Sequence, residues 1–172
     1  EILDREFPVS DIPDAFVRES LQHEAYELPR QRLYIGGDKY LTALDKALSE
    51  GKQWILVDGP SGGGKSALLA NWLQSVRDSD KNIVVHAHYL GATADATDPV
   101  FLVRRLIECI KRKTESEDDL ASDPDELLDS LPTWLAIASS WCEMHGRKFL
   151  FAIDALNGLS ERRDLRWFPR ML

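Results

Sequence analysis

The sequence predicts an α/β fold in three layers, with a mainly parallel β-sheet between two layers of helices. Short, uninterrupted apolar runs, typical of strands buried on both faces, alternate with longer segments in which apolar residues recur every three or four positions. Gly and Asp stand at many boundaries between these segments. With 172 residues, of which 44% are hydrophobic, the chain is long enough to bury one core.

Two helices are expected before the first strand. Residues 1–14 have the composition of a linker, and an amphipathic helix follows them until Pro29. Its apolar stripe consists of Val17, Leu21, Ala25 and Leu28. A second helix is expected from Asp38 to Gly51. We expect residues 1–32, a linker and a helix, to precede a domain that begins at residue 33 and continues to residue 172.

Three strands are expected, over residues 54–57, 83–89 and 149–153. A helix follows the first strand, and its face toward the sheet carries Leu69, Trp72, Leu73 and Val76. Another helix follows the second strand, because apolar residues recur at helical spacing from 103 to 110. Strands that are joined through helices lie parallel in a sheet.

An acidic loop and a capped helix are expected between the second and third strands. Five of the ten residues from 114 to 123 are acidic, which favours a solvated loop. Asp123, Pro124 and Glu126 form a pattern typical of a helix start, and Gly146 is placed to end that helix.

The charge and cysteine content exclude several classes of function. The chain has 29 acidic and 21 basic residues and a formal net charge of -8, so we expect no specific nucleic-acid binding. Cys109 and Cys142 lack the paired spacing of a zinc site. No apolar run has the length of a membrane span, and we expect a cytoplasmic protein that does not bind membranes.

A glycine-rich segment between the first strand and its helix fits the phosphate-binding pattern G-x-x-x-x-G-K-[ST]. Its residues are Gly59, Pro60, Ser61, Gly62, Gly63, Gly64, Lys65 and Ser66. In such a loop the backbone N–H groups and the helix N-terminus surround a phosphate, and the lysine neutralises it. The alternative is a glycine-rich turn with a solvated lysine.

Two polar residues follow the third strand. Asp154 is placed to hold Mg²⁺ through water, with the Ser66 hydroxyl as a direct ligand, although an Asp after a strand also caps turns. Asn157 can hydrogen-bond an attacking water but cannot take its proton, so slow hydrolysis is expected.

Several segments resemble the signal-transduction P-loop ATPases, the STAND class. They are the Leu-Tyr-Ile-Gly run at 33–36, the glycine loop with its helix, the His-Tyr-Leu-Gly-Ala run at 88–92, and the Asp-Ala-Leu-Asn run at 154–157. Over residues 24 to 172 the chain is similar to the NACHT-type module of nephrocystin-3-like and telomerase-associated proteins.

The resemblance implies a P-loop NTPase fold and a nucleotide-gated switch of conformation and oligomerisation within a larger signalling protein. ATP and Mg²⁺ are the implied cofactors, bound by a Walker A loop at 59–66 and a Walker B acid at Asp154. Self-association and protein partners through flanking domains are also implied. Because ATPases of this class carry a further strand after the Walker B strand, we expect the sheet to be truncated and residues 33–172 to be the N-terminal part of the module.

The resemblance also completes the set of expected site residues. Tyr34 and Ile35 would lie against the adenine, and Ala67 joins the nucleotide-binding loop. Lys65, Asp154 and Asn157 are the expected catalytic residues of a weak ATPase, and Ser66 and Asp154 the expected metal ligands.

Other functions remain open. One is a nucleotide-binding scaffold without hydrolysis, which the absence of an acid at Asn157 favours. Another is a small-molecule kinase, for which the segment from Tyr89 to Asp98 offers only two acids, Asp95 and Asp98. His86 and His88 share one side of that strand, which is compatible with two metal ligands or with a polar strand end.

Overall fold

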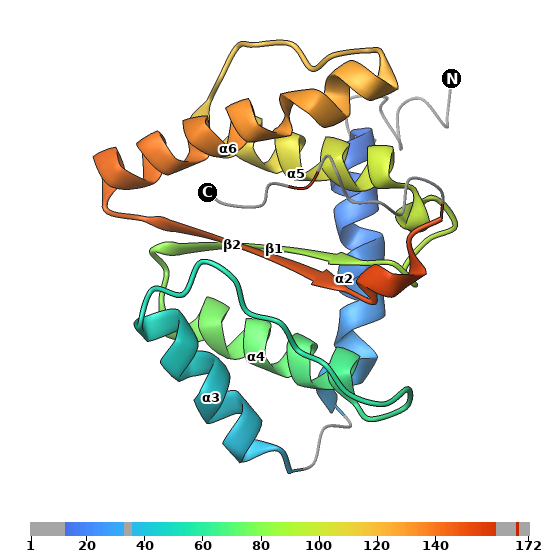
Figure 1. Ribbon diagram of the computed structural model, residues 1–172, viewed down its shortest axis with the longest axis vertical. Helices are drawn as coiled ribbons and strands as arrows, with labels where there is room; N and C mark the ends of the chain where they lie inside the picture. Colours follow the sequence, from blue (N-terminus) through green and yellow to red (C-terminus); the bar gives the residue numbers. More distant parts are fainter. Residues whose placement is uncertain (1–12, 33–35, 161–167, 169–172) are drawn as a thin grey trace, which may run out of the picture.

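The computed structural model describes residues 13–32, 36–160 and 168 (Figure 1). Among these residues there are five α-helices and two β-strands. The helices are α2 (Ala15–Arg32), α3 (Asp38–Ser49), α4 (Lys65–Ser79), α5 (Pro99–Thr114) and α6 (Pro124–His145). The strands are β1 (Ile83–Tyr89) and β2 (Lys148–Asp154), and the short 3-10 turns are η2 (Asp95–Thr97) and η3 (Leu156–Gly158).

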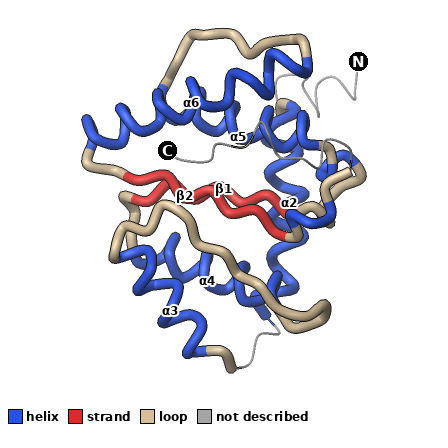
Figure 2. The backbone as a smooth tube through the Cα atoms, viewed as in Figure 1, coloured by secondary structure: helices blue, strands red, loops and turns tan. Residues whose placement is uncertain are grey.

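β1 and β2 pair in parallel and cross the middle of the molecule (Figure 2). Ile83 pairs with Lys148 at one end, and Tyr89 pairs with Asp154 at the other. Parallel strands place their carboxyl ends at the same edge of a sheet, so Asp154 lies beside Tyr89.

Helices cover both sides of this sheet (Figure 1). α5 and α6 lie on one side and share a core whose fully buried members include Leu102, Ile107 and Leu127. α3 and α4 lie on the other side, where Trp72, Leu73 and Val76 of α4 pack with Tyr89 and Ala152 of the sheet. The predicted sheet-facing residues of α4 are therefore confirmed, with Leu69 partly buried beside them.

Local signals set the start of α5 and both ends of α6, and the signals for α6 are the predicted ones. Asp98 caps α5 by accepting a hydrogen bond from the Val100 N–H at 2.9 Å. Asp123 caps α6 by accepting from the backbone N–H groups of Asp125 and Glu126. Gly146 ends α6 at a φ of 62°, a conformation that favours glycine.

The segment 54–57 is not a strand, contrary to the prediction. Its backbone makes no ladder with β2 or with any other described residue. Ile55 and Val57 pack against the core beside α4, whereas Leu56 is 88% exposed and Trp54 is 46% exposed. A strand buried on both faces would hide all four side chains and pair its backbone.

The predicted P-loop NTPase fold is therefore wrong for the described residues. That fold needs an extended parallel sheet at its centre, but the described chain is mainly helical and its sheet has two strands. The strand that the glycine loop was expected to follow is an unpaired segment.

α2 also differs from its predicted form. The helix continues through Pro29 to Arg32, and the predicted apolar stripe faces outward, with Leu21 52% exposed and Leu28 51% exposed. Its buried face carries His23 and Glu27 instead. The reason is that both polar side chains find partners inside: His23 accepts from the Tyr89 N–H, and Glu27 pairs with Arg77 of α4.

Candidate functional site

The glycine loop lies at the same end of the molecule as the carboxyl ends of the strands (Figure 1). Gly62 and Gly64 have φ values of 76° and 81°, in the left-handed region that favours glycine. A Cβ on Gly63 would lie 3.0 Å from the Pro60 carbonyl oxygen. The loop therefore needs glycine at all three positions. Gly62 and Gly64 are required for their backbone conformation, and Gly63 is required because a side chain would press on Pro60.

The loop leads directly into α4, which begins at Lys65. Gly64 is the N-cap and supplies no side-chain acceptor, so the first N–H groups of α4 have no side-chain cap. Such groups carry a partial positive charge that favours an anion. Ser66 and Ala67, both half-buried, occupy the next positions of this first turn.

Lys65 folds back over the loop. Its Nζ donates to the carbonyl oxygens of Gly59 at 2.7 Å and Pro60 at 2.9 Å. These bonds hold the ammonium group at the mouth of the loop. The arrangement therefore gathers a lysine, glycine backbone and a helix N-terminus in one place.

Asp154 and Asn157 lie at the end of β2. Asp154 is 7% exposed, and its backbone carbonyl accepts from the Leu90 N–H at 3.4 Å. Asn157 is exposed within η3, which follows the left-handed residue Ala155. Tyr89 beside Asp154 is fully buried, and burial and then the Glu27 charge raise the pKa of its phenol.

The predicted metal role of Ser66 and Asp154 finds no support. The described part of the chain contains no group of three or more His, Cys, Asp or Glu side chains placed to hold a metal ion. Tyr34 and Ile35, predicted to contact a nucleotide, lie outside the described residues.

A buried polar cluster, formed by His23 of α2, His86 and His88 of β1 and Arg105 of α5, was not anticipated from the sequence. All four side chains are at most 7% exposed. The spacing of His86 and His88 places them on one side of the strand, but nothing local to the sequence places His23 against them. The His23 and His88 rings lie 4.8 Å apart between centroids.

The hydrogen bonds of this cluster define the neutral tautomers. The Tyr89 N–H donates to His23 Nδ1 at 3.0 Å, so His23 carries its proton on Nε2. Arg105 donates to His88 Nδ1 at 3.2 Å, and His88 Nε2–H donates to the Ala96 carbonyl at 2.7 Å.

Burial keeps these histidines uncharged. It lowers the pKa of His23 to about 3 and the pKa of His88 to about 4, and the Arg105 charge adds to the lowering. The same two causes hold the pKa of His86 well below its ordinary value. Arg105 itself has a pKa lowered to about 10, chiefly by burial.

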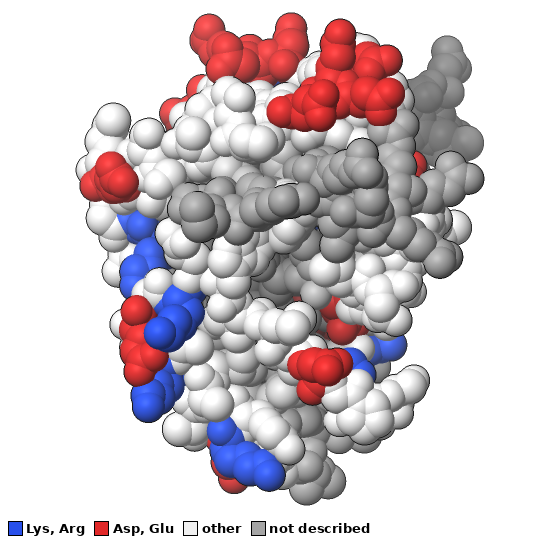
Figure 3. Space-filling model, in the orientation of Figure 1, with Lys and Arg blue, Asp and Glu red and all other residues white. Residues whose placement is uncertain are grey.

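Surface charge is unevenly distributed. Acidic side chains gather at the end of the molecule where α5 connects to α6, the top of Figure 3. From residue 114 to residue 146 the chain has nine Asp and Glu residues and no Lys or Arg. The glycine loop lies at the other end (Figure 1), away from this concentration of negative charge.

Comparison with known proteins finds distant relatives that are much longer than this chain. A TPR repeat-containing protein of Dictyostelium discoideum is 22% identical over 98% of this chain and 14% of its own length. Human nephrocystin-3 is 26% identical over 66% of this chain and 8% of its own length. Mouse tetratricopeptide repeat protein 41 is 24% identical over 70% of this chain and 10% of its own length.

No protein-family model and no solved structure matches the chain. It spans about a tenth of the length of these curated relatives.

These comparisons correct the assignment that was based on motifs. No family model places the chain among STAND-class or NACHT-type ATPases, and two of the relatives above are named for tetratricopeptide repeats. The predictions of an ATP-binding switch, and of ATP and Mg²⁺ as cofactors, were therefore wrong. The alternatives that also required a nucleotide, a scaffold and a kinase, are not supported either. In addition, none of the described helices combines the length and apolar character that a membrane span needs.

Proposed function

We propose that this chain is a protein-interaction module of a larger protein, and that the outward face of α2 contacts the partner. The observation that carries the proposal is the exposure of Val17, Leu21 and Leu28, whose exposed fractions are 37%, 52% and 51%. These residues share one face of the helix, because they are spaced four and seven positions apart. Apolar side chains exposed together mark surfaces for contact with other proteins.

The kind of partner follows from the geometry of this face. Apolar anchors at i, i+4 and i+11 on one helix suit packing against another helix. Relatives named for tetratricopeptide repeats support this proposal, since such repeats are stacked helices that form extended binding surfaces.

The test compares two double variants of the full protein. Leu21→Glu with Leu28→Glu places charge on the outward face, and we expect it to weaken partner binding at least tenfold. Ala15→Glu with Gln22→Glu adds the same charge at exposed positions away from the stripe. A photoreactive residue at position 17 is used to crosslink the bound partner. The proposal requires that the first variant no longer crosslinks the partner and that the second variant still does. Equal recovery with both variants contradicts it.

The residues of the glycine loop form a second part of the proposal. We propose that residues 59–66 hold an anionic group of the partner, such as a carboxylate or a phosphate. The uncapped N-terminus of α4 and the Lys65 ammonium support this role. Asp154 and Asn157 lie at the end of β2, and the proposal gives them no part in holding the anion.

Inorganic phosphate is the probe for this part. Titration followed by NMR should shift the amide signals of Gly62 to Ser66, and Lys65→Ala should weaken binding about tenfold because a charged hydrogen-bond donor is lost. Lys81→Ala removes a lysine whose Nζ contacts the Arg77 carbonyl on another part of α4 and should leave binding unchanged. Shifts that are absent, or equal in both variants, contradict an anion site in the loop.

A further inference from the structure

The edge of β1 that faces away from β2 has no strand partner among the described residues. Side chains cover it instead. The Tyr89 N–H donates to His23 of α2, and the Ala87 carbonyl accepts from Arg105 of α5 at 3.5 Å. Unpaired strand edges that are not covered expose backbone groups to other chains. α2 thus covers this edge at Tyr89, and α5 covers it at Ala87.

The hydrogen bond from the Tyr89 N–H to His23 forms only while His23 is uncharged. A neutral imidazole has one acceptor nitrogen, which the Tyr89 N–H uses, whereas a protonated imidazole has two donors and no acceptor. Protonation of His23 would therefore oppose two donors across the contact and would add charge beside Arg105, which already disfavours it.

His86 depends on α2 in a different way. Its ring stacks on Phe16 of α2 at 6.1 Å between centroids and meets Phe151 of β2 edge to face. Within the described residues, His86 Nε2 and His23 Nε2 are buried without a hydrogen-bond partner. At His23 the Nε2 atom already carries a proton, so an added proton would go to Nδ1, toward which the Tyr89 N–H donates. At His86 a proton on Nε2 would have no acceptor.

Two negative groups of α2 lie nearby. Glu27 is paired with Arg77 of α4. Glu19 favours the charged form of Arg105, and within the described residues its Oε2 atom is buried without a hydrogen-bond partner. The titratable and charged groups that face the histidine cluster are Glu19 and Glu27 from α2, Tyr89 from β1, Arg105 and Cys109 from α5, Arg77 from α4, and Asp154 from β2.

We propose that α2 is a pH-sensitive latch on the edge of β1, held in place by uncharged histidines and released when those histidines take up protons. The direction follows from the proton balance. In the released state His23 and His86 regain ordinary titration near pH 6.5, while in the closed state they stay neutral to much lower pH. Lowering the pH below about 6.5 therefore favours release, by about tenfold per pH unit for each histidine. This inference goes beyond the proposed function, because it concerns how the helix that carries the outward apolar face is held.

Hydrogen exchange of the Tyr89 amide in the full protein tests the latch. After correction for the intrinsic rate, we expect its opening constant to rise more than tenfold between pH 6 and pH 5, while amides of α6 stay protected. Exchange of Tyr89 that is independent of pH, or that always equals exchange through global unfolding, overturns the proposal.

Two variants separate the histidines from general instability. His23→Asn keeps an acceptor for the Tyr89 N–H and removes one titrating group, so the increase in the opening constant should fall from about a hundredfold to about tenfold per pH unit. His86→Phe keeps the ring contacts and should reduce the slope in the same way. His145→Asn, at an exposed position on α6, is the matched control and should change nothing. Slopes that remain unchanged in both cluster variants refute the latch.

Discussion

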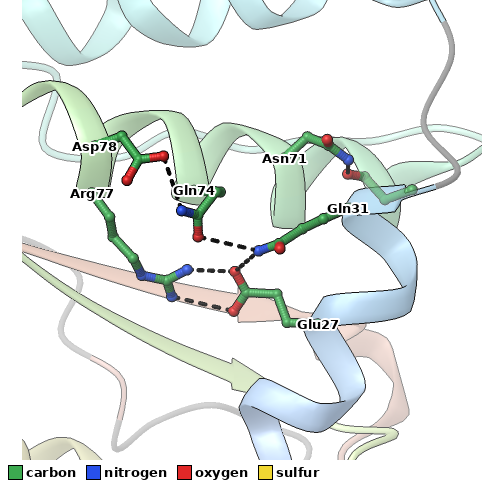
Figure 4. Close-up of polar contacts among 7 residues, drawn as sticks. Glu27, Gln31, Asn71, Gln74, Arg77 and Asp78 are labelled. Carbon is green, nitrogen blue, oxygen red and sulfur yellow. Dashed lines mark hydrogen bonds and ion pairs between the residues drawn. The ribbon is translucent and has the colours of Figure 1, made fainter.

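Glu27 on α2 binds Arg77 on α4 through both of its carboxylate oxygens (Figure 4). Glu27 is 3% exposed, and Gln31 donates a further hydrogen bond to it at 3.0 Å. Gln31 in turn contacts Gln74 of α4 at 3.4 Å. This network explains how a helix can turn its polar face inward and still pack stably.

Arg77→Ala should destabilise the protein by about 2–3 kcal/mol, because it leaves the buried Glu27 carboxylate without its charged partner. Lys46→Ala breaks the exposed ion pair with Glu50 and should cost less than about 0.5 kcal/mol. Urea unfolding of both variants measures the difference. Similar losses in the two variants would show that the Glu27–Arg77 pair is no stronger than a surface pair.

The free energy of unfolding should decrease as the pH falls from about 6.5 toward 4. The folded pKa values of His23 and His88, about 3 and about 4, lie below the unfolded value, so the unfolded chain binds more protons in this window. Each buried histidine should contribute a slope of about 1.4 kcal/mol per pH unit. Chemical denaturation at several pH values gives the slope, and a flat profile would mean that the histidines titrate normally in the folded protein.

Gly64→Ala should destabilise the protein by about 1–2 kcal/mol, because residue 64 has a φ of 81° and alanine is strained there. Gly63→Ala should also be destabilising, for a different reason: its Cβ would press on the Pro60 carbonyl oxygen. Thermal unfolding compares both with Ser61→Ala at an exposed loop position. Loss of stability in the serine variant alone would contradict the glycine requirement.

Asp123→Ala should cost about 1 kcal/mol, because Asp123 accepts the first free N–H groups of α6. Asp125→Ala, two residues later in the first turn of α6, removes the same charge without removing the cap. Denaturant midpoints of the two variants should differ accordingly, and equal midpoints would assign the effect to charge alone.

Elements that depend on local signals were predicted well. β1, β2 and the end of α6 at Gly146 match the expected runs and breaks, and the buried face of α4 carries Trp72 and Leu73 as expected. The segment 54–57 was not predicted correctly, because an apolar run becomes a strand only if another strand pairs with its backbone. The role of Lys65 and its loop remains a proposal, and so does the domain boundary at residue 33.

The sequence by itself determined the positions of β1, β2 and α6, since caps such as Asp123 and runs of apolar residues act over a few neighbouring residues. The tertiary structure alone decided that α2 faces inward with His23 and Glu27 and outward with Leu21. Helical periodicity favours burying leucine. The inward face was instead selected by two partners that are distant along the chain. His23 accepts from the Tyr89 N–H, 66 residues away, and Glu27 pairs with Arg77, 50 residues away.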